Sequence, residues 1–295
     1  MYAPPPMPPV AVVTDTTGYL PVDVVEANGI ELVSLYVNFG GERTEREADL
    51  RDYDVFYDEL RSAEALPTTS QPSIGDFIEV YEPLLAEGRD VVSVHISAGL
   101  SGTSGAAQQA KEALERDGRG GERVHVLDSS TAAGGLGLVA LAAARRAASG
   151  ADAESVLAHA REARAELKMW FAIDTLEFLK RSGRIGAASA WIGSTLKIKP
   201  ILTLEAEITP VERVRTSTRM FERMVDYARQ REGSGANGWV VQHIQAREPA
   251  TALADRCREI FGREPVFFSE VGPVLGAHTG PGLLGVGSIP ERFLV

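Results

Sequence analysis

The sequence predicts an α/β protein with two α/β domains. Short apolar runs typical of buried strands alternate with amphipathic helical segments, and this alternation builds βαβ units around a largely parallel sheet. The 295 residues suit one large domain or two of ordinary size, and a hydrophobic content of 44% is enough for buried cores. A Ser-Gly-Ala-Asp stretch interrupts the pattern near residue 150, so we place a domain boundary between residues 150 and 175.

In the first half, strand patterns lead into helical patterns, which predicts a mostly parallel sheet. Residues 73–87 give a strong helical signal, because apolar side chains recur on one face and Ser73 is suited to cap the N-terminus. Residues 135–140 are best explained as the small-residue face of an Ala-rich helix. The predicted strands are 10–14, 30–39, 91–96 and 124–127, and the predicted helices are 21–27, 50–61, 73–87, 101–116 and 131–149.

The second half differs, because two strand patterns joined by an acidic turn predict an antiparallel pair within a mixed sheet. The predicted strands are 169–173, 199–204, 208–215, 239–244, 266–269 and 285–294, and the predicted helices are one that ends near 167, 219–231 and 249–261. We assign residues 10–165 to an N-terminal domain and 166–295 to a C-terminal domain. The proline-rich residues 1–9 lack the basic and apolar parts of a signal peptide and are expected to be disordered.

Composition excludes several classes of protein. The net charge is −11 and no run of Lys or Arg occurs, so we expect no nucleic-acid partner. No stretch approaches about 18 consecutive apolar residues, which excludes a membrane-spanning helix. The single cysteine, Cys257, excludes an internal disulfide and a cysteine zinc site, and its apolar helical surroundings predict a buried, inert thiol. We therefore expect a cytoplasmic protein.

Motifs for nucleotides and metals fail on their structural requirements. Residues 280–285 match G-x-G-x-x-G by letter, but a dinucleotide site needs a following helix and acidic residue, and we expect none in the ten residues after Gly285. No Gly-Lys dipeptide exists, so there is no P-loop. No two histidines have the spacing of a shared metal site, and we expect neither a metal nor a cofactor.

Four loops are rich in hydroxyl side chains and glycine: 14–17, 67–73, 97–103 and 277–282. Free backbone N–H groups at helix N-termini make such loops suitable for anionic oxygens. None of the four carries a Lys or Arg, which a phosphate site usually recruits. A single carboxylate can be held by hydroxyls, amides and one histidine. The loops therefore favour a carboxylate ligand.

His278 is the histidine best suited to a ligand site, because it precedes a Gly-Pro-Gly turn where the backbone can approach a ligand closely. The histidines inside strand patterns, expected to be structural, are His95, His125 and His243. Arg184 and Arg215 lie in short basic segments of an otherwise acidic chain. They are either contacts for a partner or phosphate, or ordinary solvated charges.

Ser101 supports a second hypothesis, a serine esterase in which His278 is the base and Asp15 or Asp128 orients it. The nucleophile elbow of such enzymes reads G-x-S-x-G, whereas the last position here is Thr103. Ser101 also opens a predicted helix, where capping the N-terminus is its ordinary role. The elbow is therefore only half present.

Taken in order, these loops resemble the DegV family, whose members bind a long-chain fatty acid. The matching segments cover nearly the whole chain, and together they are far more specific than any one of them. They are 14–16 with Leu20-Pro21, 69–72, 97–103, 128–129, 182–185, 196–201, 214–216 and 278–282.

The resemblance implies a carrier without catalytic residues, with the acyl chain in a tunnel largely within the N-terminal domain and the carboxylate near the domain junction. The expected ligand is a fatty acid of the palmitate or oleate class. The residues that would hold its carboxylate are Thr69, Ser97, Ser101 and His278. The usual Ser-Ser-Gly-Leu-Ser-Gly loop has Ala98 as its second residue here, which removes one hydroxyl.

The resemblance also implies a protein partner. In some relatives the bound fatty acid is presented to a separate kinase, which makes an acyl-phosphate for phospholipid synthesis. Arg184 matches a residue implicated in that step, and we expect Arg184 and Arg215 to face a partner kinase. The resemblance is also compatible with transient contact between such a carrier and a membrane.

Overall fold

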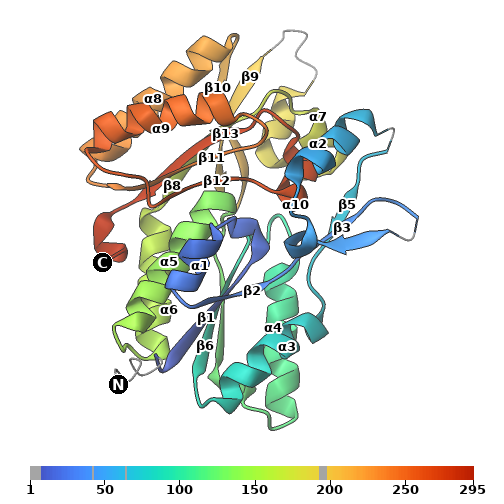
Figure 1. Cartoon of the computed structure of the whole chain (residues 1–295), viewed down its shortest axis with the longest axis vertical. Helices are drawn as coiled ribbons and strands as arrows, with labels where there is room; N and C mark the ends of the chain where they lie inside the picture. The colour runs from blue at the N-terminus through green and yellow to red at the C-terminus, as the bar shows by residue number, and fades with distance from the viewer. Residues whose placement is uncertain (1–7, 42, 64, 193–197) are drawn as a thin grey trace.

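The computed structural model describes residues 8–41, 43–63, 65–192 and 198–295, and two large sheets lie on either side of a central helix (Figure 1). The first sheet is entirely parallel, and its strands come from the first half of the chain. In spatial order they are β2 (Ile30–Val33), β1 (Val10–Asp15), β6 (Asp90–His95) and β7 (Val124–Asp128). The predicted α/β class with a parallel N-terminal sheet is confirmed.

The second sheet is mixed, and its strands come from the second half of the chain. In spatial order they are β10 (Glu207–Val214), β9 (Lys199–Glu205), β8 (Lys168–Ala172), β13 (Leu284–Ile289), β11 (Gly238–His243) and β12 (Phe267–Glu270). Strands β11 and β12 are parallel, whereas the other neighbouring pairs are antiparallel. The predicted antiparallel pair, β9 and β10, is therefore confirmed.

Helices cover the parallel sheet through alternate strand residues. The helices of this half are α1 (Val22–Ala27), α2 (Tyr53–Ser62), α3 (Ile74–Ala86), α4 (Thr103–Arg116), α5 (Ala133–Ala148) and α6 (Ala153–Glu166). In β1, Ala11 and Val13 join the core formed with α3 and α4, whereas Val10 and Val12 join the core on the opposite face. Ser73 is the N-cap of α3, as predicted, and forms a capping box.

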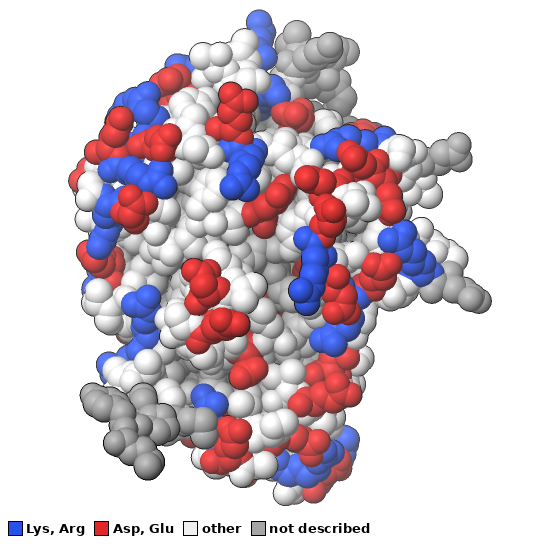
Figure 2. Space-filling view, viewed as in Figure 1, with Lys and Arg blue, Asp and Glu red and all other residues white. Residues whose placement is uncertain are grey.

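The outer face of the mixed sheet is covered by α8 (Ser217–Gly233) and α9 (Arg247–Phe261). Cys257 of α9 is buried in this core, as predicted, and burial raises the pKa of its thiol to about 12. Acidic side chains are interspersed with basic ones over the face shown in Figure 2. Across the described part of the chain, no helix combines the length and apolar character needed to cross a membrane.

Helix α5 separates the two sheets and is buried over most of its length. It packs against β1 and β6 on one side and against β11 and β13 on the other. A Cβ atom on Gly137 would lie 2.8 Å from Cζ of Phe267, and one on Gly134 would lie 2.8 Å from a methyl group of Val240. Such contacts are too short for real side chains, so the predicted small-residue face of α5 is what lets the mixed sheet approach.

The prediction of a single strand over residues 30–39 is wrong, because these residues form two strands that belong to different sheets. The chain turns after β2, where the Glu47 N–H donates to the Leu35 carbonyl at 2.8 Å and the Ala48 N–H donates to Ser34 Oγ at 3.1 Å. The next strand then belongs to a small antiparallel sheet. Its members are β4 (Thr44–Arg46), β3 (Tyr36–Asn38) and β5 (Thr68–Ser70).

Several short elements of the fold were not predicted from the sequence. Strand β5 lies in a segment predicted to be a loop, and His278 lies on a helix instead of in a loop. The two unpredicted helices are α7 (Glu177–Arg181) and α10 (Pro273–Thr279). The expected disordered tail, 1–9, and the matched segment 196–201 lie partly outside the described residues.

Glu47 is a buried carboxylate where the two halves of the chain meet. Its Oε2 accepts the Thr16 hydroxyl at 2.5 Å, and its Oε1 accepts the Tyr19 hydroxyl and the Val274 N–H, both at 2.8 Å. Only 2% of Glu47 is exposed. Burial raises the pKa of Glu47 to about 7, and its three hydrogen-bond donors only partly oppose this.

We predict that Glu47 makes the fold more stable as the pH falls from about 7 to 4.5. Its folded-state pKa of about 7 lies above the ordinary 4.5, so the folded protein holds a proton that the unfolded chain releases in this window. The effect is about 3 kcal/mol over the whole window. Chemical denaturation at pH 8 and pH 4 should show the wild type gaining stability relative to Glu47→Gln, and an unchanged difference would contradict the assignment.

Candidate functional site

A cavity of about 320 Å³ lies between the two sheets, where α5 begins. Its apolar lining residues come from both halves of the chain: Leu35, Ile96, Leu100, Ala132, Ala133, Met169, Phe171, Leu179, Leu204, Ile208, Val240, Val271, Val274, Leu275, Leu283 and Val286. The expectation of a tunnel largely within the N-terminal domain therefore needs correction. The inner face of the mixed sheet forms much of the wall, because α5 begins at Ala133 and the cavity occupies the space next to its first turn.

Thr69 and His278, both predicted to hold a carboxylate, meet at this cavity. The distance between Thr69 Oγ1 and His278 Nε2 is 2.7 Å, although 209 residues separate them in the chain. Thr69 lies on β5 opposite Val37 of β3, and His278 lies in the last turn of α10. The small antiparallel sheet thus brings a hydroxyl from the first half to a histidine from the second half.

The Gly-Pro-Gly turn ends α10 directly after the site. Gly280 has a φ of 72°, and a Cβ atom there would lie 2.4 Å from the ring of Phe178. Gly282 has a φ of 90°, and its Cβ would lie 2.4 Å from a carboxylate oxygen of Asp174. Glycine is required at both positions, because another residue would be strained and would also collide. This close packing fixes the chain that follows His278.

His278 is neutral at physiological pH. Burial, and to a smaller extent the positive charge of Arg184, lower its pKa to about 4. Its Nδ1 atom is buried and has no hydrogen-bond partner among the described residues. If Nε2 accepts the Thr69 proton, Nδ1–H is a free donor; if Nε2–H donates to Thr69, the Thr69 hydroxyl is the free donor. Either tautomer leaves one proton of the pair without an acceptor among the described residues.

The two predicted serines have different surroundings. Ser101 lines the cavity, and its Oγ lies 2.8 Å from Thr103 Oγ1. Gly102, not Ser101, occupies the N-cap position of α4, so the expected capping role is wrong. Ser97 is buried outside the lining, where its hydroxyl donates to the Ala206 carbonyl at 2.5 Å. The structure therefore places Ser101 beside the cavity and uses the Ser97 hydroxyl to anchor the loop.

The loop that carries Ser101 packs directly on the segment that carries Thr69. A Cβ atom on Gly102 would lie 2.1 Å from Oε1 of Gln71, so glycine allows this approach. Arg184 is exposed and also lines the cavity, which places it at the mouth. Arg215 is exposed but does not line the cavity. Of the predicted residues, Thr69, Ser101, Arg184 and His278 are brought together, and Ser97 and Arg215 are not.

A family model described as "Uncharacterised protein, DegV family" matches residues 9–291. The chain belongs to the DegV family. A DegV domain-containing protein from Streptomyces coelicolor is 41% identical over 285 residues, which cover 94% of this chain and 97% of the relative. The resemblance drawn from the sequence is thereby confirmed.

Two solved DegV structures are similar over nearly their whole length. One is a DegV family protein from Thermus thermophilus, described in terms of fatty acid binding, with 34% identity, a TM-score of 0.83 and coverage of 95% of this chain and 99% of that one. The other is DegV from Bacillus subtilis, described as a fatty acid binding protein, with 32% identity, a TM-score of 0.84 and coverage of 96% and 100%.

In this DegV chain, the contacts required by the esterase hypothesis are not formed among the described residues. The Ser101 hydroxyl is hydrogen-bonded to Thr103, and His278 is hydrogen-bonded to Thr69. Asp128 accepts the N–H groups of Ala98 and Ser130. The described residues place no carboxylate on His278 Nδ1, and no group of three or more His, Cys, Asp or Glu among them is placed to hold a metal ion.

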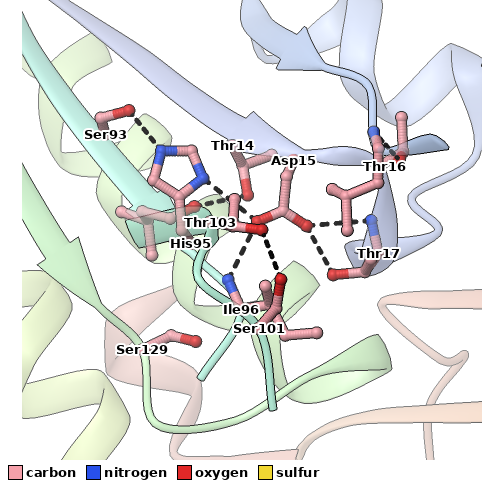
Figure 3. Close-up of polar contacts among 12 residues, drawn as sticks. Thr14, Asp15, Thr16, Thr17, Ser93, His95, Ile96, Ser101, Thr103 and Ser129 are labelled. Atoms are coloured by element: carbon pink, nitrogen blue, oxygen red, sulfur yellow. Dashed lines mark hydrogen bonds and ion pairs between the residues drawn. The ribbon is translucent and has the colours of Figure 1, made fainter. Parts of the chain in front are cut away.

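Asp15 instead belongs to a buried network that sequence analysis missed (Figure 3). Its Oδ2 accepts the Ile96 N–H at 2.9 Å and lies 3.1 Å from His95 Nδ1. His95 Nε2 lies 2.6 Å from Ser93 Oγ, which accepts the Tyr81 hydroxyl at 2.7 Å. The network holds the start of the loop that carries Ser97 and Ser101.

The position of this network in the sheet could have been anticipated. Asp15 ends β1 and His95 ends β6, and these adjacent parallel strands finish at the same edge. All four strands are parallel, but the chain adds β2 on one side of β1 and then adds β6 and β7 on the other side, so the order of strands switches between β1 and β6. Ligands of open α/β sheets bind outside the carboxyl ends of strands at such a switch point. The cavity includes Ile96, directly after β6, as this rule predicts.

We predict that His278 of the ligand-free DegV protein titrates near pH 4 in an NMR experiment, with its signal assigned by comparison with His278→Gln. Arg184→Gln should raise the midpoint, because a nearby positive charge is removed, whereas Arg215→Gln should leave it unchanged. Because the folded-state pKa lies below the ordinary 6.5, protonation of His278 should destabilise the fold as the pH falls from 6.5 to 4. A midpoint near 6.5 would contradict the buried, neutral imidazole.

Proposed function

We propose that this chain is a carrier that binds a long-chain fatty acid of the palmitate or oleate class and catalyses no reaction itself. The observation that carries the proposal is an apolar cavity of about 320 Å³ whose lining includes Thr69, Ser101, Arg184 and His278. The descriptions of the Thermus thermophilus and Bacillus subtilis relatives as fatty acid binding support it.

The energetics of an acyl chain agree with such a site. Burial of sixteen carbons contributes on the order of 12 kcal/mol, at about 0.8 kcal/mol per CH₂ group. Association and ordering oppose this by roughly 4–15 kcal/mol. Tight binding is therefore attainable with few polar contacts, provided that the walls are apolar. The aliphatic side chains from both sheets meet that requirement.

The carboxylate is proposed to accept hydrogen bonds from the Thr69–His278 pair and from Ser101. The positive charge of Arg184 at the cavity mouth favours an anion. A bound carboxylate would also raise the pKa of His278, because a neighbouring negative charge stabilises the imidazolium form. Ser97 contributes indirectly, since its bond to the Ala206 carbonyl anchors the serine loop.

The proposal includes presentation of the carboxylate to a partner kinase, with Arg184 and Arg215 facing that partner. Support comes from Arg184, which is both exposed and part of the lining, so that a group on its outer side could approach the ligand. We also propose a cytoplasmic location and two domains, 10–165 and 166–295. The parallel sheet lies before that boundary and the mixed sheet after it, which supports the division.

Mass spectrometry of the purified protein, native and then after solvent extraction, tests the carrier proposal. We expect a stoichiometric C14–C18 acid. A protein that is empty and also fails to take up added palmitate or oleate would overturn the proposal. A panel of p-nitrophenyl acyl esters tests the alternative, because turnover that is abolished in Ser101→Ala would establish an esterase.

We predict that Thr69→Ala and His278→Ala each lower palmitate affinity by roughly 10- to 100-fold without unfolding the protein. Hydrogen bonds to a charged group contribute about 1.5–3 kcal/mol, and about 1.4 kcal/mol is a factor of ten. Thr68→Ala is the matched control, because Thr68 is exposed on the same strand and does not line the cavity. Calorimetry that gives wild-type affinity for both site variants would remove this pair from the carboxylate site.

A further inference from the structure

Helix α10 brings the second half of the chain to the carboxylate site, and its seven residues leave it little intrinsic stability. Besides His278, it contributes Val274, Leu275 and Thr279 to the cavity lining. The position of the imidazole therefore depends on what holds the start of this helix.

The first turn of α10 is held by side chains from the opposite end of the chain. A helix leaves its first N–H groups without intrahelical partners. Pro273 has no N–H, the Val274 N–H donates to Glu47 Oε1 at 2.8 Å, and the Leu275 N–H donates to the Tyr19 hydroxyl at 3.1 Å. Tyr19 in turn donates to Glu47, so both contacts depend on this one carboxylate.

Tyrosine rings contact the backbone of α10 directly. A Cβ atom on Gly272 would lie 2.7 Å from a ring carbon of Tyr19, and one on Gly276 would lie 2.2 Å from the Tyr57 hydroxyl. Tyr57 donates that hydroxyl to the Val271 carbonyl at 2.7 Å. The tyrosine rings therefore pack directly on the helix backbone, with no side chain of Gly272 or Gly276 in between.

We propose that Glu47 is a positioning residue for the carboxylate site. It accepts the Val274 N–H and the Tyr19 hydroxyl, and so fixes α10 at the angle that brings His278 Nε2 to Thr69. Glu47 does not line the cavity, so it acts on the ligand through His278. The consequence for fatty acid affinity rests on the proposed function, whereas the consequence for His278 itself does not.

The titration of His278 in the ligand-free protein tests the proposal independently of any lipid. Glu47→Ala should move the NMR midpoint upward from about 4 toward 6.5, because a loosened α10 exposes the imidazole. Glu47→Gln should stay near the wild-type value, because its amide oxygen can still accept the Val274 N–H. Glu45→Ala is the control, since Glu45 pairs with Arg43 at the surface and should have no effect.

Palmitate binding then distinguishes positioning from a general structural role. Glu47→Ala should lower palmitate affinity about tenfold more than hexadecanol affinity, because Val274 and Leu275 contact either ligand whereas His278 favours the carboxylate. This difference between the two ligands should disappear in a His278→Ala background. Equal losses for palmitate and hexadecanol, or a difference that persists in the double variant, would overturn the proposal. If palmitate does not bind the wild type, the proposed function fails and the titration still decides the role of Glu47.

A conservative variant covers the case in which Glu47→Ala does not fold. Tyr19→Phe keeps the ring against Gly272 and removes the hydroxyl that accepts the Leu275 N–H. It should raise the His278 midpoint in the same direction as Glu47→Ala. A midpoint that remains at about 4 in Tyr19→Phe, or in a folded Glu47→Ala protein, would overturn the proposal.

Discussion

The burial of α5 between the two sheets is the constraint from which the site follows. Along its length the helix separates the sheets, and its glycines let the mixed sheet come within contact distance. Where α5 begins, at Ala133, the sheets are already apart, and the space next to that first turn is the cavity. The same geometry explains why the cavity walls are apolar, because they are the inner faces of sheets that a helix covers elsewhere.

The polar part of the cavity is formed by elements that close over this space. Strand β5 supplies Thr69, the loop after β6 supplies Ser101, and α10 supplies His278. These elements are far apart in the sequence and are tied together by buried groups that do not touch the cavity. The Asp15 network holds the loop after β6, and Glu47 holds α10. The relative positions of Thr69, Ser101 and His278 therefore depend on the hydrogen bonds of both the Asp15 network and Glu47.

Thr69, Ser101 and His278 could be predicted as site residues from the sequence, because hydroxyl loops and a histidine before Gly-Pro-Gly are local signals, and all three line the cavity. The sequence alone could not show that Thr69 and His278 are hydrogen-bonded to each other, since this contact depends on a three-residue strand inside a polar segment. The direction of the Ser97 hydroxyl was equally hidden, because neighbouring hydroxyls in a loop look alike in one dimension. Glu47 lies in an acidic stretch that resembles solvated charge, and only the fold reveals its burial.

The division between apolar walls and a weakly charged polar end has a functional consequence. If acyl burial supplies most of the affinity, the polar groups mainly decide which end of the ligand lies at the mouth. A neutral His278 suits that role, because the Thr69–His278 pair keeps one hydrogen-bond donor in either tautomer, without the strong attraction of a buried cation. The exposed Arg184 then supplies positive charge on the solvent side of the cavity. Under the proposed function, a carboxylate held in this way is oriented toward the surface, where a second protein would meet it.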